Sequence, residues 1–153
     1  IFNLNNYEKE EGSGFYFKKD ISFNNSEFKL IGVGCRYKIL LSMYSVGMYI
    51  NNIPGNLKIK NSIETILNDE SKKILLLKIY REIDILSMIS ALNSAFLKRI
   101  EKEKKINQNL LHLEWILKKY IKNGLKQNDE LLFEWDTNKI NIYIGKNDKE
   151  INN

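Results

Sequence analysis

The sequence predicts an α+β protein in which a large, mostly antiparallel sheet carries a layer of helices on one face. Three features favour this class: period-two apolar runs in the first half, two long segments with helical spacing in the second half, and a closing pair of alternating runs. About six strands would share the sheet. The length of 153 residues suits one domain with a single core.

The start of the chain differs in composition from the rest. Residues 1–14 are polar and rich in Asn and Glu, which predicts a flexible N-terminal arm, and residues 15–153 are predicted to form one domain without an internal repeat or linker. Because the chain begins with Ile1 rather than Met, its start is expected to be processed or trimmed. Any targeting segment would have been removed with it.

Short runs of alternating apolar residues predict the strands. A turn at residues 24–26 joins the run that ends at Phe23 to the run that begins at Phe28, and strands are expected over residues 28–37 and 42–50. The strand over residues 73–83 has the clearest pattern. Both of its alternating sets are apolar in the middle, as in a strand that is buried on both faces. Residues 131–135 and 140–144 predict a closing hairpin.

Two helices are predicted between the last of these strands and the closing hairpin. Asp84 would cap a helix over residues 84–104, and Asn107 would cap a second over residues 107–123, which Gly124 ends. Apolar residues at three-and-four spacing should be buried, with Tyr120 also inward. This stripe comprises Ile85, Met88, Ile89, Leu92, Phe96, Leu113, Leu117 and Ile121.

Composition argues against several functions. The longest apolar candidate, residues 39–50, is interrupted by Ser42, Ser45 and Gly47 and is too short for a membrane span. The net charge of +5 is carried almost entirely by Lys, which alternates with Glu in residues 101–105, as on a solvated helix face. We therefore expect a soluble protein without a nucleic-acid partner.

Cysteine and histidine chemistry is also restricted. Cys35 is the only cysteine and His112 the only histidine, so an internal disulfide or a multi-cysteine metal site cannot form. The two residues lie on very different segments, which argues against a catalytic dyad. We expect no metal and no cofactor.

Arg36 is the residue that stands out. It follows an apolar run that contains Gly32-Val33-Gly34, which lacks the third Gly and the following helix of a dinucleotide fingerprint. Glycines in a strand indicate close approach of backbone or ligand. A guanidinium within an apolar strand would need an anion, and it offers a two-pronged site for a carboxylate or a developing oxyanion. Alternatively, Arg36 reaches solvent at a strand end or pairs with a Glu.

Two consecutive motifs resemble the signature of the chalcone isomerase family. Leu30-Ile31-Gly32-Val33-Gly34-Cys35-Arg36 is similar to the family's Gly-x-Gly-x-Arg strand, and Met43-Tyr44-Ser45-Val46-Gly47-Met48-Tyr49-Ile50 to its next strand. Residues 74–81, 125–130 and 142–146 resemble further pieces in the correct order, so the resemblance covers most of residues 15–149. It implies an open-faced β-sandwich whose ligand lies in a cleft between the sheet and the helices.

The resemblance also implies the site residues. In the lipid-binding members the strand Arg and the first Tyr of the second motif hold a carboxylate, and these correspond to Arg36 and Tyr44. Tyr49 and Asn93 complete the implied ligand-binding set. In the isomerases the same Arg stabilises an oxyanion, aided by a Thr on the second strand and by a Tyr and an Asn seven residues apart. Here Tyr44 replaces the Thr and Leu86 stands at the Tyr position.

This residue set favours a non-catalytic protein that binds a fatty acid or related carboxylate lipid. Two alternatives stay open: a non-catalytic interaction or scaffold protein with a filled pocket, and a chalcone–flavanone isomerase-type intramolecular lyase. A reducing compartment and a plastid-type organelle are both compatible with the sequence, and the oligomeric state is left open.

The sequence departs from the family at two places. A straight strand from Arg36 to Tyr44 would separate the two residues by about 26 Å, too far to share one ligand head. A hairpin bend is therefore expected near residues 39–42, unless residues are missing there. The family's final helix, which would lie beyond Asn153, is expected to be absent.

Overall fold

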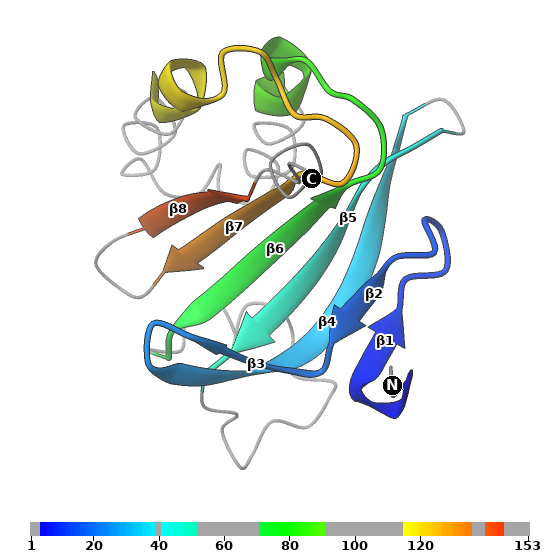
Figure 1. Cartoon of the computed structure of the whole chain (residues 1–153), viewed down its shortest axis with the longest axis vertical. Helices are drawn as coiled ribbons and strands as arrows, with labels where there is room; N and C mark the ends of the chain where they lie inside the picture. The colour runs from blue at the N-terminus through cyan, green and yellow to red at the C-terminus, as the bar shows by residue number, and fades with distance from the viewer. Residues whose placement is uncertain (1–3, 39–40, 52–70, 91–114, 136–139, 146–153) are drawn as a thin grey trace, which may run out of the picture. The chain divides into compact units, whose positions relative to one another are not determined.

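The computed structural model describes residues 4–38, 41–51, 71–90, 115–135 and 140–145. The chain divides into two compact units, one formed by residues 1–80 and 128–153 and the other by residues 81–127 (Figure 1). None of the helices in the described residues has the length and apolar character required to cross a membrane.

The first unit contains a six-stranded sheet in the order β3-β4-β5-β6-β7-β8 (Figure 1). All neighbouring strands are antiparallel, which confirms the predicted sheet. The strands are β3 (Asp20–Phe23), β4 (Ser26–Lys38), β5 (Leu41–Ile50), β6 (Lys73–Ile79), β7 (Glu130–Trp135) and β8 (Ile140–Gly145).

The pairing of residues at the two ends of β4 sets the register of its neighbours in the sheet. Asn24 and Asn25 have φ values of 47° and 62° and connect β3 to β4, which confirms the predicted turn. Asn tolerates positive φ better than most residues, which suits a two-residue hairpin loop. At the other end Lys38 pairs with Leu41, so the chain reverses between them. The predicted hairpin bend is thereby confirmed.

Strand alternation gives the sheet two faces. We call one the Arg36 face, because Tyr44, Val46, Met48 and Ile50 of β5 point to it together with Arg36 of β4. The deeply buried residues of the Arg36 face lie on β5, β6 and β7. They are Tyr44, Ile50, Leu77, Ile79, Leu131 and Phe133.

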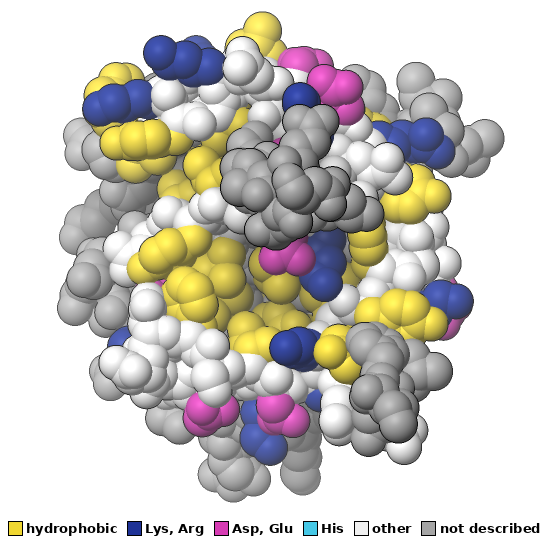
Figure 2. All heavy atoms as spheres, in the orientation of Figure 1, with side chains coloured by type: hydrophobic (Ala, Val, Ile, Leu, Met, Phe, Trp, Pro, Cys, Tyr) yellow, Lys and Arg dark blue, Asp and Glu magenta, His cyan; other side chains and the backbone are white. Residues whose placement is uncertain are grey.

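The opposite side, here called the hairpin face, carries Ser45, Gly47 and Tyr49 of β5. Its core is the buried cluster of Phe28, Tyr49 and Ile74, against which Ile21, Phe23, Leu30, Leu76 and Leu132 pack. Hydrophobic side chains gather in a hollow over the sheet in the view of Figure 2. Because both faces are apolar, β6 has the nearly continuous apolar sequence that predicted burial on both sides. It ends at Ile79, earlier than the predicted residue 83.

A second, two-stranded sheet precedes the large one. After a 3-10 turn at Leu4–Asn6, β1 (Tyr7–Lys9) pairs with β2 (Tyr16–Lys18). The sequence predicts a flexible arm over residues 1–14, whereas the described residues of this segment form regular structure. The carboxylate of Glu10 accounts for the difference, since it accepts hydrogen bonds from the backbone N–H of Gly12 (3.0 Å) and Ser13 (2.7 Å).

This N-terminal hairpin lies over the hairpin face. The Phe17 ring covers Gly47 so closely that a Cβ on Gly47 would come within 2.5 Å of it. The hydroxyl of Tyr49 donates a hydrogen bond to the Lys18 carbonyl at 2.7 Å, and Ser45 donates to Glu10 at 3.2 Å. A glycine is therefore required in the middle of β5 because an aromatic ring occupies the space of its side chain.

The second unit contains helical segments over residues 85–90 and 115–120. Asp84 caps the first as predicted, since its carboxylate accepts a hydrogen bond from the Ser87 N–H at 2.8 Å. Gly124 has a φ of 74° and donates to the Ile121 carbonyl at 3.0 Å, so it ends the second segment as predicted. Ile83 and Leu125 join in an isolated antiparallel bridge.

The predicted helical stripe is confirmed where it can be followed. Four members are buried (Met88, Ile89, Leu117 and Ile121) and Ile85 is half-buried. Leu92, Phe96 and Leu113 lie outside the described residues. The inward position predicted for Tyr120 is wrong, because this side chain is 62% exposed. Tyr120 lies at the edge of the stripe, where its hydroxyl can remain in water.

Candidate functional site

Arg36 and Tyr44 lie directly opposite each other on β4 and β5. Directly opposed residues of an antiparallel pair share a face and have Cβ atoms about 4.5–5.5 Å apart. The reversal between the two strands therefore brings together the two residues that the motifs associate, although eight positions separate them in the chain. Both belong to the first unit.

The strand pairing becomes irregular immediately beside this pair. The register shifts between Arg36 and Tyr37, so that Tyr37 pairs with Ser42 and Met43 has no partner in the ladder between β4 and β5. The Met43 carbonyl instead accepts a hydrogen bond from the Tyr80 N–H at 2.9 Å. Such bulges change the direction of the strand and are common next to binding sites.

The two side chains differ in exposure. Tyr44 is 5% exposed, and burial raises the pKa of its phenol, while the charge of Arg36 acts in the opposite direction and Cys35 adds a smaller increase. The phenol therefore keeps its proton and can donate a hydrogen bond at neutral pH. Arg36 itself is exposed. Contrary to the expectation from the sequence, the Arg36 guanidinium does not require an anion, since water can solvate it.

The exposure of Arg36 agrees with the alternative of an arginine that reaches solvent at a strand end. Within the part of the chain that the structure describes, the ion pairs join Lys29 to Asp20 and Lys78 to Glu130, and neither involves Arg36. Arg36 thus presents its donors where a dissolved anion can approach them.

Two glycines precede Arg36 on the same face of β4. Gly32 and Gly34 lie four and two residues before it and pair with Met48 and Val46. A Cβ added to either glycine would meet nothing within 4 Å. Together they form what we call the glycine strip, a stretch of open backbone that runs about 13 Å from Gly32 to Arg36.

Tyr49, another expected ligand-binding residue, is not brought to this pair. Tyr49 points to the hairpin face, is fully buried and donates its hydroxyl to the Lys18 carbonyl. Burial strongly raises the pKa of Tyr49, and Glu130 adds to the effect. Five residues from Tyr44 in a regular strand, it cannot contact the same ligand head. Asn93 lies outside the described residues.

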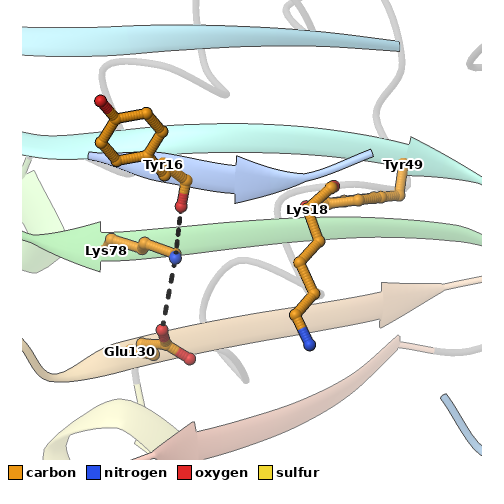
Figure 3. A network of polar contacts seen from close by, with 5 residues as sticks. All are labelled: Tyr16, Lys18, Tyr49, Lys78 and Glu130. Atoms are coloured by element: carbon orange, nitrogen blue, oxygen red, sulfur yellow. Dashed lines mark hydrogen bonds and ion pairs between the residues drawn. The ribbon is translucent and has the colours of Figure 1, made fainter. Parts of the chain in front are cut away.

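Lys78 is a polar residue of the sheet whose role the sequence did not indicate. Figure 3 shows its ammonium between the Tyr16 carbonyl (2.8 Å) and the Glu130 carboxylate (3.8 Å), and it also lies 4.9 Å from the centre of the Phe17 ring. Burial lowers the pKa of Lys78, and Glu130 partly opposes this. The only sequence signal was one Lys inside the apolar strand. These contacts attach the N-terminal hairpin to the hairpin face.

The described residues show no site for a metal ion. No group of three or more His, Cys, Asp and Glu side chains there could hold a metal ion. Cys35 is half-buried on the hairpin face, opposite Ser45, and its thiol lies 3.9 Å from the Arg36 carbonyl oxygen.

The protein thus combines an antiparallel sheet with an arginine–tyrosine pair on one apolar face of that sheet. The family model described as chalcone isomerase-like matches residues 9–153, so the chain belongs to this family. No curated protein sequence matches it. The crystal structure of a fatty-acid binding protein of Arabidopsis thaliana matches with a TM-score of 0.71 and 19% identity, over 92% of this chain and 79% of that one.

These comparisons confirm the family and the fold class that the motifs predicted. The structural match extends over most of both chains, so the curved antiparallel sheet is the chalcone isomerase-like sheet. At 19% identity it establishes the fold alone.

Proposed function

We propose that this protein binds a fatty acid or a related carboxylate lipid on the Arg36 face, without catalysing a reaction. One observation carries the proposal: the cross-strand pair of Arg36 and Tyr44 stands at the end of the open glycine strip. Such a ligand has a charged head group and an extended apolar chain. The Arg36–Tyr44 pair would bind the head group, and the glycine strip would accommodate the chain.

The pair supplies the donors for the carboxylate. The guanidinium of Arg36 can give two parallel hydrogen bonds to the two oxygens. Tyr44 can donate a third, since burial raises its pKa and holds the ring in place. Exposure of Arg36 favours this role, because a ligand has to reach the guanidinium and displace only water.

The glycine strip would accommodate the acyl chain. Gly32 and Gly34 leave the backbone uncovered, and Met48 and Val46 lie beside them on β5. Apolar contact along such a strip contributes roughly 0.8 kcal/mol for each buried methylene. The fold is shared with a protein whose structure is described as that of a fatty-acid binding protein, which supports the proposal without assigning the ligand.

One observation favours the scaffold alternative. Ile79 and Leu77 on the Arg36 face are no more than 1% exposed, as expected if the chain's own side chains fill this part of the face. A filled face would leave Arg36 without a ligand. The experiment below distinguishes the two functions, because a scaffold would not discriminate an acid from its ester.

The test is titration of a long-chain fatty acid and its methyl ester against the wild type and Arg36→Ala. We expect the variant to lose at least about tenfold in affinity for the acid, since hydrogen bonds to charged groups contribute roughly 1.5–3 kcal/mol each. Binding of the ester should change little. Equal loss for acid and ester, with the fold retained, would mean that Arg36 has a structural role. Absence of any binding to the wild type would favour the scaffold function.

A further inference from the structure

The second unit carries an exposed set of aromatic and basic side chains that the fatty-acid site does not use. Trp115 is 56% and Tyr120 62% exposed, and Lys118, Lys119 and Lys122 are exposed around them. We call these five residues the basic–aromatic patch. Figure 2 shows lysine and hydrophobic side chains next to each other over residues 115–120, the helix drawn in yellow in Figure 1.

Helical spacing places the patch away from the buried side of its segment. Leu117 and Ile121, four residues apart, are 1% and 2% exposed and form the inward stripe. Trp115, Lys118 and Lys119 follow the i, i+3, i+4 spacing of another face. A solvent-facing helix surface normally carries charged groups, and two large exposed rings on it are an exception that burial within this unit does not explain.

The charge of this segment has one sign. Residues 115–128 contain four lysines and no Asp or Glu. In residues 101–105, by contrast, lysines alternate with Glu. A surface of this kind is complementary to a partner with closely spaced negative charges.

The contacts of the rings indicate which anionic partner fits. The Lys119 ammonium lies 4.9 Å from the centre of the Trp115 ring and 5.4 Å from that of the Tyr120 ring. A single-stranded nucleic acid stacks its bases on open ring faces, whereas here the ammonium occupies one face of each ring. Trp and Tyr beside lysines are instead the typical residues of the boundary between water and lipid, where the rings lie among head groups and the ammonium groups contact phosphate.

We propose that the basic–aromatic patch docks on an anionic lipid bilayer surface. The docking is peripheral: the rings enter the head-group layer and the lysines bind lipid phosphates. It does not require the fatty-acid site, because the patch belongs to residues 81–127 while Arg36 and Tyr44 belong to the other unit.

Flotation of the full chain with phosphatidylcholine vesicles, with and without phosphatidylglycerol, tests the proposal. We expect binding only to the anionic vesicles and release by salt. The combined change of Lys118→Gln, Lys119→Gln and Lys122→Gln should lower the partition coefficient about a hundredfold, at about fivefold per lysine. The matched control of Lys9→Gln, Lys19→Gln and Lys72→Gln removes the same charge from exposed positions of the other unit and should retain most of the binding.

Tryptophan fluorescence gives an independent measurement. The chain has two tryptophans, Trp115 and Trp135. Anionic vesicles should shift the emission of the wild type to shorter wavelength, and Trp115→Phe should remove the shift without loss of the fold, because the ring is exposed. Arg36→Ala should float like the wild type, so failure of the fatty-acid proposal would leave this result unchanged.

Three results would overturn the proposal. The first is no binding to anionic vesicles. The second is equal loss in the patch variant and its control, which would indicate attraction by net charge alone. The third is tighter binding to a single-stranded oligonucleotide than to vesicles, with loss in the patch variant, which would identify a nucleic acid as the partner.

Discussion

In the proposed carboxylate site, Arg36 and Tyr44 would divide two tasks between an exposed and a buried residue. The guanidinium is accessible, and the phenol is held in place by burial and keeps its proton. The resemblance to the chalcone isomerase family implied that these residues act together, and the pairing of β4 with β5 places them opposite each other. The sequence left open whether Arg36 is exposed, since its exposure depends on segments remote in sequence. The burial of Tyr49 was also not predictable from the sequence, because its hydroxyl donates a hydrogen bond to the Lys18 carbonyl, 31 positions away.

The substitution Gly34→Leu should prevent the fatty acid from binding without destabilising the fold. Gly34 has open space at its Cβ position, and among the described residues the structure places positive φ at other glycines, so a larger residue fits the strand. The leucine side chain would occupy the glycine strip, and fatty-acid affinity should fall by at least about tenfold, or about 1.4 kcal/mol.

Calorimetric titration measures the loss, and a thermal unfolding curve checks the fold. Gly34→Ala serves as the matched control, since its single methyl should reduce affinity much less. Unchanged binding by a folded Gly34→Leu protein would place the acyl chain somewhere other than the glycine strip.

Among the elements, the strands of the large sheet could be predicted and the N-terminal hairpin could not. The strands of the sheet have alternating or, in β6, nearly continuous apolar patterns, but Tyr7–Lys9 offers only one apolar residue to mark β1. What holds β1 and β2 in place is a set of long-range contacts, above all Glu10 with Ser45 and Phe17 with Gly47. Contacts between positions about thirty residues apart leave no periodic signal in the sequence.

The Glu10 carboxylate should make the stability of this hairpin depend on pH. Burial is the largest single influence and raises its pKa, but the hydrogen bonds from Ser13, Gly12 and Ser45 together outweigh burial and lower the pKa below the ordinary value of 4.5. A carboxyl with a depressed pKa in the folded state stabilises the fold above its unfolded pKa. This stabilisation is lost as the pH falls through the folded pKa.

We therefore expect Glu10→Gln to lower the free energy of unfolding by roughly 1.5–3 kcal/mol at neutral pH. The difference from the wild type should shrink as the pH falls below 4.5. Urea unfolding at a series of pH values measures it, and other carboxyls such as Asp84 cancel in the difference. Glu11→Gln changes an exposed neighbour and is the control. A difference that is constant with pH would show that the charge of Glu10 does not stabilise the hairpin.

At the scale of the whole molecule, the family assignment covers residues 9–153 but leaves the reaction undetermined, because a fold can be retained while its chemistry is lost. The sequence was sufficient for the family, since the two strand motifs and the order of elements occur together. It was not sufficient for the ligand. Binding depends on which side chains share a face and how far each is covered, as Tyr49 and Arg36 illustrate.

The chain should fail to cyclise a chalcone above the uncatalysed rate. By the resemblance of its motifs, Arg36 would be retained for an oxyanion, whereas Tyr44 would replace the Thr of the isomerases and Leu86 their Tyr. Leu86 is 67% exposed and has no group that could polarise an enone or hold a water. Without the Thr and Tyr hydroxyls, binding of an anion by Arg36 alone would leave the activation barrier of cyclisation largely unchanged. Catalysis requires interactions that strengthen in the transition state. The measurement is the initial rate of flavanone formation with the wild type and Arg36→Ala, in parallel with buffer. A rate about a hundredfold above buffer, far below typical enzymatic accelerations, would contradict the prediction if Arg36→Ala abolished it.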